Sequence, residues 1–163
     1  MKKVILALIA MFIILLTSCG KSPASDEKKA ADYAKAKGYR ITSRDGKARK
    51  YTLEKSKLYG ATGTIPCQQV WAVQKVKPDK YLGKEIIIYG FTVKNHPLER
   101  ITKQRRNTRL YIMLSEGEVI GGYSYPNADV SGCFYSLDGK TLEEVTGLTF
   151  KEWQESWKKK YGN

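Results

Sequence analysis

The side chains best suited to covalent chemistry are one cysteine and the single histidine of the chain. A thiol beside an imidazole can ionise and act as a nucleophile, and Cys67 and His96 supply these two groups. Nothing in their spacing indicates that the two side chains meet. One histidine is also too few for a histidine-rich metal site.

Other catalytic and metal-binding patterns are absent from the sequence. The acidic residues are scattered, and the pairs 116/118 and 143/144 resemble turn and helix-cap acids. Calcium-loop, phosphate-loop and nucleophile-elbow patterns are missing, and the stretch 60–64 is only a weak small-residue loop. We therefore expect a protein that is not an enzyme and that needs no cofactor or metal.

The N-terminus carries the most specific motif. Two lysines precede residues 4–16, which contain no polar side chain. A permanent membrane span needs about 20 apolar residues, so this shorter run is typical of an export signal. The stretch Leu16-Thr17-Ser18-Cys19 then resembles the lipobox of bacterial lipoproteins, which implies cleavage before Cys19 and a diacylglycerol thioether on it. An ordinary signal peptide or an uncleaved anchor is the alternative.

This interpretation sets the compartment and the domain boundaries. Residues 1–18 form a lipoprotein signal peptide, residues 19–25 the lipidated cysteine and a short tether, and residues 26–163 a single domain. The acyl chains would hold the protein at the extracytoplasmic face of the cell membrane. Chemistry driven by ATP or NAD(P)H is not expected there.

The charge of the chain is strongly positive. Cleavage after residue 18 removes two of the 29 basic residues and none of the 16 acidic ones, so the excess falls from +13 to +11. Such a surface attracts polyanions, which outside a bacterial membrane are lipid headgroups and teichoic acids rather than nucleic acid.

Five cations lie close together without an intervening acid: Arg100, Lys103, Arg105, Arg106 and Arg109. Arginine forms bidentate contacts with phosphate, so this basic segment is a candidate contact for a partner or a polyanion. A solvated loop is the alternative interpretation.

The two remaining cysteines form an even pair in a compartment that permits disulfides. A bridge between Cys67 and Cys133 would span a separation of 66 residues. The chain-entropy model assigns such a bridge about 4 kcal/mol of stability before strain. Two buried free thiols are the alternative.

The apolar patterns predict an α+β fold with an antiparallel sheet of about 4–6 strands and an N-terminal and a C-terminal helix packed on it, on one side. A thin apolar stripe places the helix at 26–37 on the edge of the fold. Asp45-Gly46 predicts a hairpin between two short strands, residues 52–60 a single helical turn, and residues 68–76 a strand.

The clearest strand is 84–94, which should be central because both of its faces are apolar near its start. One face carries Ile87, Tyr89, Phe91 and Val93, and the other carries Ile86 and Ile88. A hairpin is expected around Glu116-Gly117 and a last strand within 132–137. Capping-box pairs at 141/144 and 149/152 begin two C-terminal helices.

Several blocks of the middle resemble a family of uncharacterised extracytoplasmic domains of Gram-positive bacteria. They are "KGY", "PDKYLGKEIIIYGFTVKNHP", "EGEVIGGYSYP" and "GCFYSLDG", and the resemblance covers roughly residues 28–140. It implies an α+β domain and no catalytic residues.

Aromatic residues in the expected strands offer a second kind of surface. They are Tyr89, Phe91, Tyr111, Tyr123, Tyr125, Phe134 and Tyr135. Tyrosine hydroxyls suit a groove that holds a sugar or a peptide, although a tyrosine-rich core is the simpler explanation.

The sequence therefore predicts a lipid-anchored, non-catalytic binding module. The expected partner is an envelope protein or an anionic wall polymer, contacted through the basic segment. One alternative is a small ligand or wall polymer bound in an aromatic groove. Another is interference with secretion or conjugation machinery.

Overall fold

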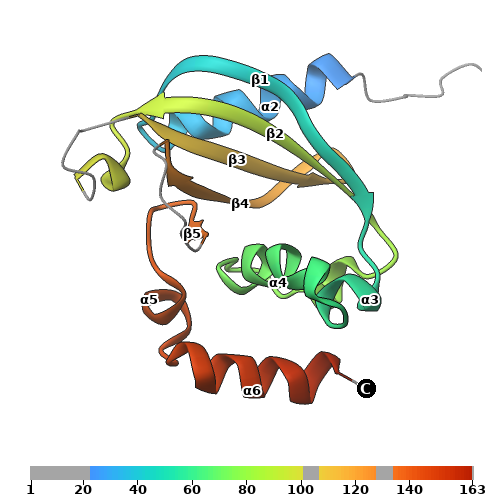
Figure 1. Ribbon diagram of the computed structural model, residues 1–163. Helices are drawn as coiled ribbons and strands as arrows, with labels where there is room; N and C mark the ends of the chain where they lie inside the picture. Colours follow the sequence, from blue (N-terminus) through green and yellow to red (C-terminus); the bar gives the residue numbers. More distant parts are fainter. Residues whose placement is uncertain (1–22, 101–106, 128–133, 163) are drawn as a thin grey trace, which may run out of the picture.

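The structure, a computed structural model, describes residues 23–100, 107–127 and 134–162. Helical segments begin and end the described chain, and others lie between its first strands (Figure 1). The helices are α2 (Pro23–Ala36), α3 (Lys55–Leu58), α4 (Ile65–Ala72), α5 (Leu142–Thr146) and α6 (Phe150–Tyr161), and the short 3-10 helices are η2 (Thr62–Thr64), η3 (Pro78–Tyr81) and η4 (Pro97–Arg100). The strands are β1 (Arg40–Thr52), β2 (Glu85–Lys94), β3 (Thr108–Ser115), β4 (Glu118–Pro126) and β5 (Tyr135–Ser136).

The five strands form one antiparallel sheet in the order β1-β2-β3-β4-β5. The predicted α+β class is therefore confirmed. The tight turn between β3 and β4 has positive φ angles at both central residues, 54° at Glu116 and 74° at Gly117. This geometry matches the right-handed twist of a hairpin, so the predicted turn is confirmed as well.

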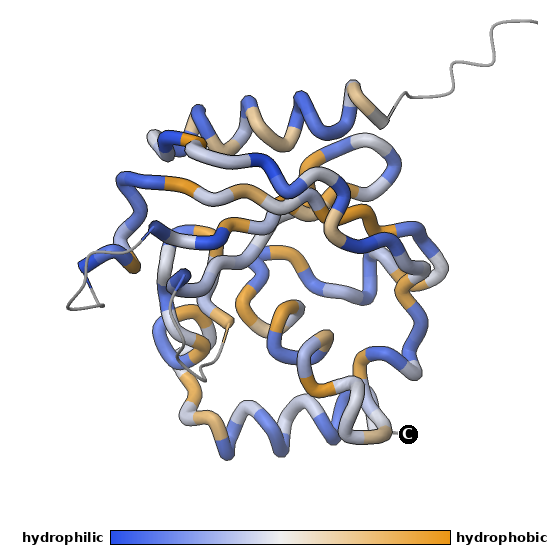
Figure 2. The backbone as a smooth tube through the Cα atoms, turned by 45° about the horizontal axis from the view of Figure 1, so that its top comes forward, coloured by the Kyte–Doolittle hydropathy of each residue, from blue (hydrophilic) through white to orange (hydrophobic). Residues whose placement is uncertain are grey.

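Strand β2 is buried on both faces, as the apolar residues on both of its faces predict. Tyr89, Phe91 and Val93 pack in a cluster with α2, whereas Ile86 and Ile88 pack in a second cluster with α3 and α4. Two apolar faces need two covering layers, so the expectation that the helices lie on one side of the sheet is wrong. Figure 2 shows the hydrophobic segments concentrated in the strands and α4, between the more polar outer helices.

Helix α2 lies across a face of the sheet and not on the edge of the fold, which corrects the sequence-based expectation. Ala30, Ala31 and Ala34 are fully buried against the strands. Their small side chains let the helix backbone approach the sheet closely, so a thin apolar stripe is sufficient. The helix begins at Pro23, three residues before the domain boundary expected at residue 26.

The hairpin expected at Asp45-Gly46 is also wrong, because β1 is one continuous strand paired with β2 along its length. Its register shifts at three places, between residues 41 and 43, 44 and 46, and 47 and 49. Gly46 has a φ of 69°, which is a left-handed conformation. Glycine adopts this conformation in β-bulges as well as in hairpin turns. The same glycine signal therefore marks a bulge here.

The strand expected within 68–76 is in fact helix α4. Its apolar residues Val70 and Trp71 are buried against the sheet. The free energy gained by this burial outweighs the strand propensity of the two residues. A proline in the first turn favours the helix start. The single turn predicted at 52–60 is confirmed as α3.

Both predicted capping boxes are present, at Thr141 with Glu144 and at Thr149 with Glu152. Helix α4 lies between the sheet and α6 (Figure 1). The Trp157 Nε1 donates to the Leu58 carbonyl at 2.6 Å and so ties α6 to α3. Helix α6 thereby covers the side of α3 and α4 that faces away from the sheet.

The close approach of α2 to the sheet can be tested by enlarging one buried alanine. Ala31→Leu is expected to lower the free energy of unfolding by about 1–3 kcal/mol, because the added carbons have no room. Ala36→Leu changes an exposed position of the same helix and should shift it by at most about 0.5 kcal/mol. Urea unfolding measures both, and equal effects would contradict the packing described.

Candidate functional site

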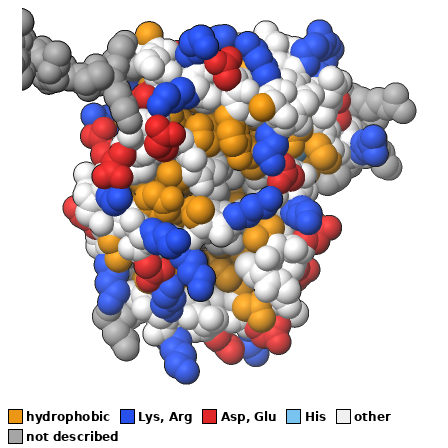
Figure 3. Space-filling model, turned by 180° about the vertical axis from the view of Figure 1, so that it is seen from behind, with side chains coloured by type: hydrophobic (Ala, Val, Ile, Leu, Met, Phe, Trp, Pro, Cys, Tyr) orange, Lys and Arg blue, Asp and Glu red, His pale blue; other side chains and the backbone are white. Residues whose placement is uncertain are grey.

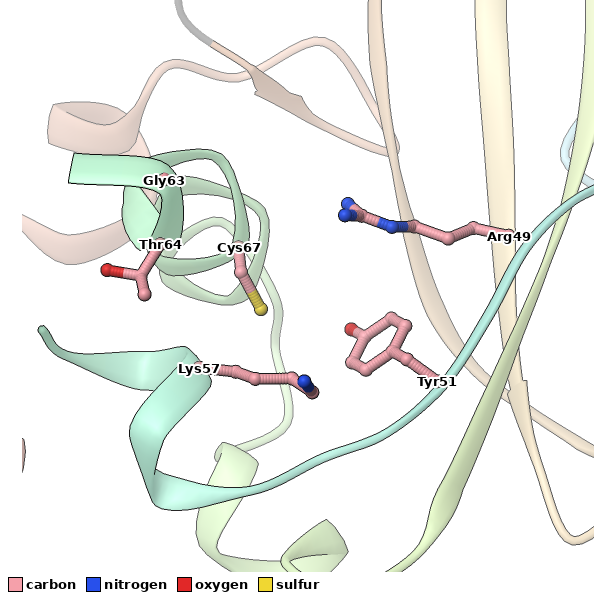
Figure 4. A pocket seen from close by; sticks show the side chains of 6 residues that line it. All are labelled: Arg49, Tyr51, Lys57, Gly63, Thr64 and Cys67. Carbon is pink, nitrogen blue, oxygen red and sulfur yellow. The ribbon is translucent and has the colours of Figure 1, made fainter. Parts of the chain in front are cut away.

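A pocket of about 200 Å³ opens where the end of β1 faces α3, η2 and the start of α4. Its lining consists of Arg49, Tyr51, Lys57, Gly63, Thr64 and Cys67. Strand geometry explains two of these residues, since side chains two positions apart lie on the same face of a strand. Figure 4 shows the side chains of β1 and α4 approaching one another across the pocket.

Two cations face this pocket, and its lining contains no acid. Among the described residues, neither Arg49 nor Lys57 has an ion-pair partner, whereas Arg44 of the same strand pairs with Glu27 at 3.5 Å. The Arg49 guanidinium carbon lies 5.8 Å from the centre of the Tyr51 ring, so aromatic contact orients it. The pocket is therefore a site of positive potential.

Neutral polar groups form the back of the pocket. The Trp71 indole Nε1 donates to the Tyr51 hydroxyl at 3.1 Å, and that hydroxyl also hydrogen-bonds the Cys67 thiol. Burial raises the pKa of Tyr51 well above its usual value. The Tyr51 hydroxyl is thus protonated at neutral pH and is held in one place.

Burial also raises the pKa of the Cys67 thiol. The hydrogen bond to Tyr51 and the charges of Arg49 and Lys57 lower it, but their effect is smaller. Reactive cysteines have depressed pKa values. The arrangement therefore favours the binding of an anion over nucleophilic attack by this thiol.

Contacts within the loop hold the rim of the pocket. The Thr64 hydroxyl donates to the Ala61 carbonyl at 2.8 Å and accepts from the Gln68 Nε2 at 2.7 Å. A Cβ at Gly63 would meet nothing within 4 Å, so this glycine leaves the rim open. The small-residue stretch 60–64 is thus part of the site, although its sequence signal is weak.

A ladder of aromatic rings lies on the same face of the sheet. The Tyr111 ring stacks on Tyr123 at 4.9 Å between centroids and on Tyr125 at 5.6 Å. Phe134 meets both Tyr123 and Tyr125 edge-on. The Tyr111 and Tyr125 hydroxyls are 3.1 Å apart and hydrogen-bonded. Tyr123 is buried and the other three are half-buried, so the ladder is both core and surface.

The ladder ends at Arg109. Its Nε donates to the Asn127 side-chain oxygen at 3.3 Å, and hydrogen bonds to Tyr111 and Tyr125 raise the pKa of its guanidinium. Burial, followed by the hydrogen bond to Tyr125, raises the pKa of Tyr111 to about 12. The Tyr111 hydroxyl is therefore a neutral donor and acceptor.

The basic segment is only partly described. Arg109 lies in β3 and Arg100 ends η4. Lys103, Arg105 and Arg106 lie outside the described residues. A contact made by all five cations therefore stays a prediction.

His96 is a structural residue of the opposite face. It is 2% exposed, and the Leu98 backbone N–H donates to its Nδ1 at 3.2 Å, so Nε2 carries the proton and donates to the Leu137 carbonyl at 3.0 Å. Leu137 belongs to the α2-side cluster and Cys67 to the α4-side cluster. The structure thus does not bring the thiol and the imidazole together.

The predicted lipid site and disulfide fall on residues that the structure does not describe. Cys19 and Cys133 lie outside the described residues, while Cys67 carries a free thiol among the described ones. Phe134, which follows Cys133 in the sequence, packs in the same cluster as Cys67. The Cys67–Cys133 bridge stays a prediction.

Within residues 23–100, 107–127 and 134–162, no group of three or more acidic, histidine or cysteine side chains could hold a metal ion. In the same part of the chain no helix is long and apolar enough to cross a membrane. Comparisons with protein-family models, curated proteins and solved structures found no match. Functional interpretation therefore depends on the residues and their geometry.

Sequence reasoning missed Arg49, Tyr51 and Lys57 as site residues. The available signal was the spacing of Arg49 and Tyr51, which share a face in any regular strand. Their partner Lys57 could not be assigned, because nothing in the sequence places α3 opposite that face.

The burial of His96 predicts a pH-dependent stability. Burial lowers the pKa of His96, against the opposing effect of its bond to Leu137. The stability contributed by the neutral ring is therefore complete above the unfolded pKa of about 6.5 and is lost as pH falls below it.

Urea unfolding between pH 7.5 and 5.0 measures this effect, with His96→Gln as the reference. The unsubstituted chain should lose stability more steeply than the variant, by at most about 1.4 kcal/mol per pH unit, because one proton is involved. Parallel curves would show that His96 is not held neutral.

Proposed function

We propose that this chain is a lipid-anchored extracytoplasmic binding module that holds a small anionic ligand in the pocket between β1 and α4. The observation that carries the proposal is the approach of Arg49 and Lys57 to one small pocket whose lining contains no acid. Two like charges on one cavity repel, so an anion between them relieves an unfavourable arrangement.

The chemistry of the two cations is complementary. The planar guanidinium of Arg49 can donate two parallel hydrogen bonds to an oxyanion, and the Lys57 ammonium adds a compact point charge. Tyr51 is a neutral hydroxyl whose position Trp71 fixes, so it can orient the ligand without competing for charge. These features favour a ligand of defined geometry over a diffuse polyanion.

Net charge alone does not locate a site on this protein. Figure 3 shows Lys and Arg side chains spread over the face seen from behind, around hydrophobic side chains near its middle. The structure supports ligand binding by the pocket more than partner binding by the basic segment, since Arg109 is already bonded to Asn127 and to two tyrosines.

The anchor and the location rest on the lipobox resemblance at Cys19. Two or three acyl chains, at about 0.8 kcal/mol per buried methylene, would hold the domain stably on a membrane. Helix α2 begins four residues after Cys19, so the domain would lie close to the lipid surface. Soluble small anions and the anionic groups of the envelope are both within reach there.

The pocket can be tested by isothermal titration of the full chain, in detergent, with inorganic phosphate. A charge-assisted hydrogen bond contributes about 1.5–3 kcal/mol, so Arg49→Met and Lys57→Met should each weaken binding roughly ten-fold or more. Methionine keeps the apolar stem of each side chain.

Lys47→Met is the matched control. Lys47 is exposed on the same strand, but it pairs with Tyr89, whose side chain faces α2, so it lies on the opposite face of the sheet. Binding should be unchanged in this variant. Equal weakening by all three substitutions would show that phosphate responds to net charge and not to the pocket.

The anchor can be tested by fatty-acid labelling of the chain expressed in bacteria. The unsubstituted chain should incorporate labelled palmitate and sediment with membranes. Cys19→Ala should do neither, because the thiol that accepts the diacylglycerol is gone. Equal labelling of both forms would refute lipidation at Cys19.

A further inference from the structure

A stretch of the sheet surface without side chains lies near the anion pocket. Gly46 of β1 pairs with Gly90 of β2, so two neighbouring positions on the α4 side carry no side chain. A Cβ at Gly90 would lie 3.2 Å from the Tyr111 Cε1 and 3.2 Å from the Asp45 Cβ. The glycine therefore leaves room for an acid and a tyrosine to approach the same position above the sheet.

The bulge in β1 is what brings Asp45 to this place. Arg44 pairs with Phe91 and Gly46 with Gly90, which leaves Asp45 without a partner in the ladder. Bulges commonly re-aim a side chain beside a functional site. Here Asp45 is exposed, and its Oδ2 would lie 3.3 Å from a Cβ at Gly90. None of the described residues forms an ion pair with it.

Tyrosines continue this surface across the sheet. Tyr111 and Tyr125 are half-buried and joined through a hydrogen bond between their hydroxyls. A carboxylate that accepts hydrogen bonds, beside phenols that donate or accept them, suits a ligand rich in hydroxyl groups. The ring edges suit its apolar C–H groups.

This surface and the anion pocket lie on one face at short range. Arg49 follows Gly46 by three residues and pairs with Ile88, which faces α4. Strand spacing of about 4.8 Å places β3, which carries Tyr111, roughly 10 Å from β1. Arg49 and Tyr51 both act electrostatically on Tyr123 of the ladder. A single compact ligand can therefore touch both parts.

We propose that the ligand is a phosphorylated carbohydrate, with its phosphate between Arg49 and Lys57 and its hydroxylated ring against Asp45, Tyr111 and Tyr125. This inference rests on the proposed anion pocket and adds the chemistry of the second half of the ligand. The acid also makes the site selective, because Asp45 repels a second negative charge while it accepts sugar hydroxyls.

Isothermal titration of the full chain in detergent tests this with four probes: inorganic phosphate, glucose, glucose 6-phosphate and glucose 1-phosphate. At least one sugar phosphate should bind about ten-fold more tightly than inorganic phosphate, and glucose alone should bind more weakly than either sugar phosphate. A glycan with phosphodiester links, titrated in parallel, shows whether the phosphorylated sugar is recognised free or within a polymer.

Asp45→Asn distinguishes this inference from simple anion binding. The variant should bind sugar phosphate several-fold more weakly, yet bind inorganic phosphate as well as the unsubstituted chain or better, because a negative charge is removed. Tyr125→Phe, which keeps the ring, should also weaken sugar phosphate alone. Thermal unfolding checks that both variants remain folded.

The outcomes separate the two proposals. Equal affinity for phosphate and for both sugar phosphates, unchanged by Asp45→Asn, would overturn the carbohydrate inference and leave the anion pocket intact. Absence of binding by all phosphate-bearing probes would overturn both.

Discussion

The apolar residues on both faces of β2 are the constraint on which the rest of the structure depends. A strand that is hydrophobic on two sides must be covered twice, and β1 and β3 must flank it. The alanines of α2 cover one face, and Trp71 of α4 with its neighbours covers the other. The chain thereby forms one layer of helices on each face of the sheet. In the sequence, only β2 indicates that both faces must be covered.

The pocket follows from this arrangement. Strand β1 is the edge of the sheet and is largely exposed, so its side chains on the α4 side are available where the helices diverge from it. The bond from Trp71 to Tyr51 joins the helix to the strand at the back of the cavity. Because the tyrosine and the thiol are neutral, the charge of the site comes from Arg49 and Lys57. We propose that this charge binds and orients an anion.

Local signals allowed much of the fold to be predicted. The alternation along β2, the Glu116-Gly117 turn and the two capping boxes each depend on a few adjacent residues, and each is present. The Asp45-Gly46 pair misled because a left-handed glycine serves a bulge as well as a turn. The sequence predicts a strand where α4 lies, because the burial of Val70 and Trp71 that favours the helix depends on distant parts of the chain.

The site was harder to predict than the fold for the same reason. Arg49 and Cys67 are far apart in the sequence, and they meet only once α4 is known to be a helix packed beneath β1. The aromatic residues were identified as strand residues, but their ladder depends on the register between β3 and β4. The run of cations at 100–109 is evident in the sequence, whereas Arg49 and Lys57 are eight residues apart with an acid between them, and only the fold shows that they share a pocket.

The most direct test of the account is an amide NMR titration of the full chain, in detergent, with inorganic phosphate. We expect saturable shifts at the residues that surround the pocket, among them Arg49, Gly63, Thr64 and Cys67. Shifts that spread over the exposed lysines of α2 and α6 and do not saturate would contradict it, because they would show that phosphate meets only the general charge of the surface.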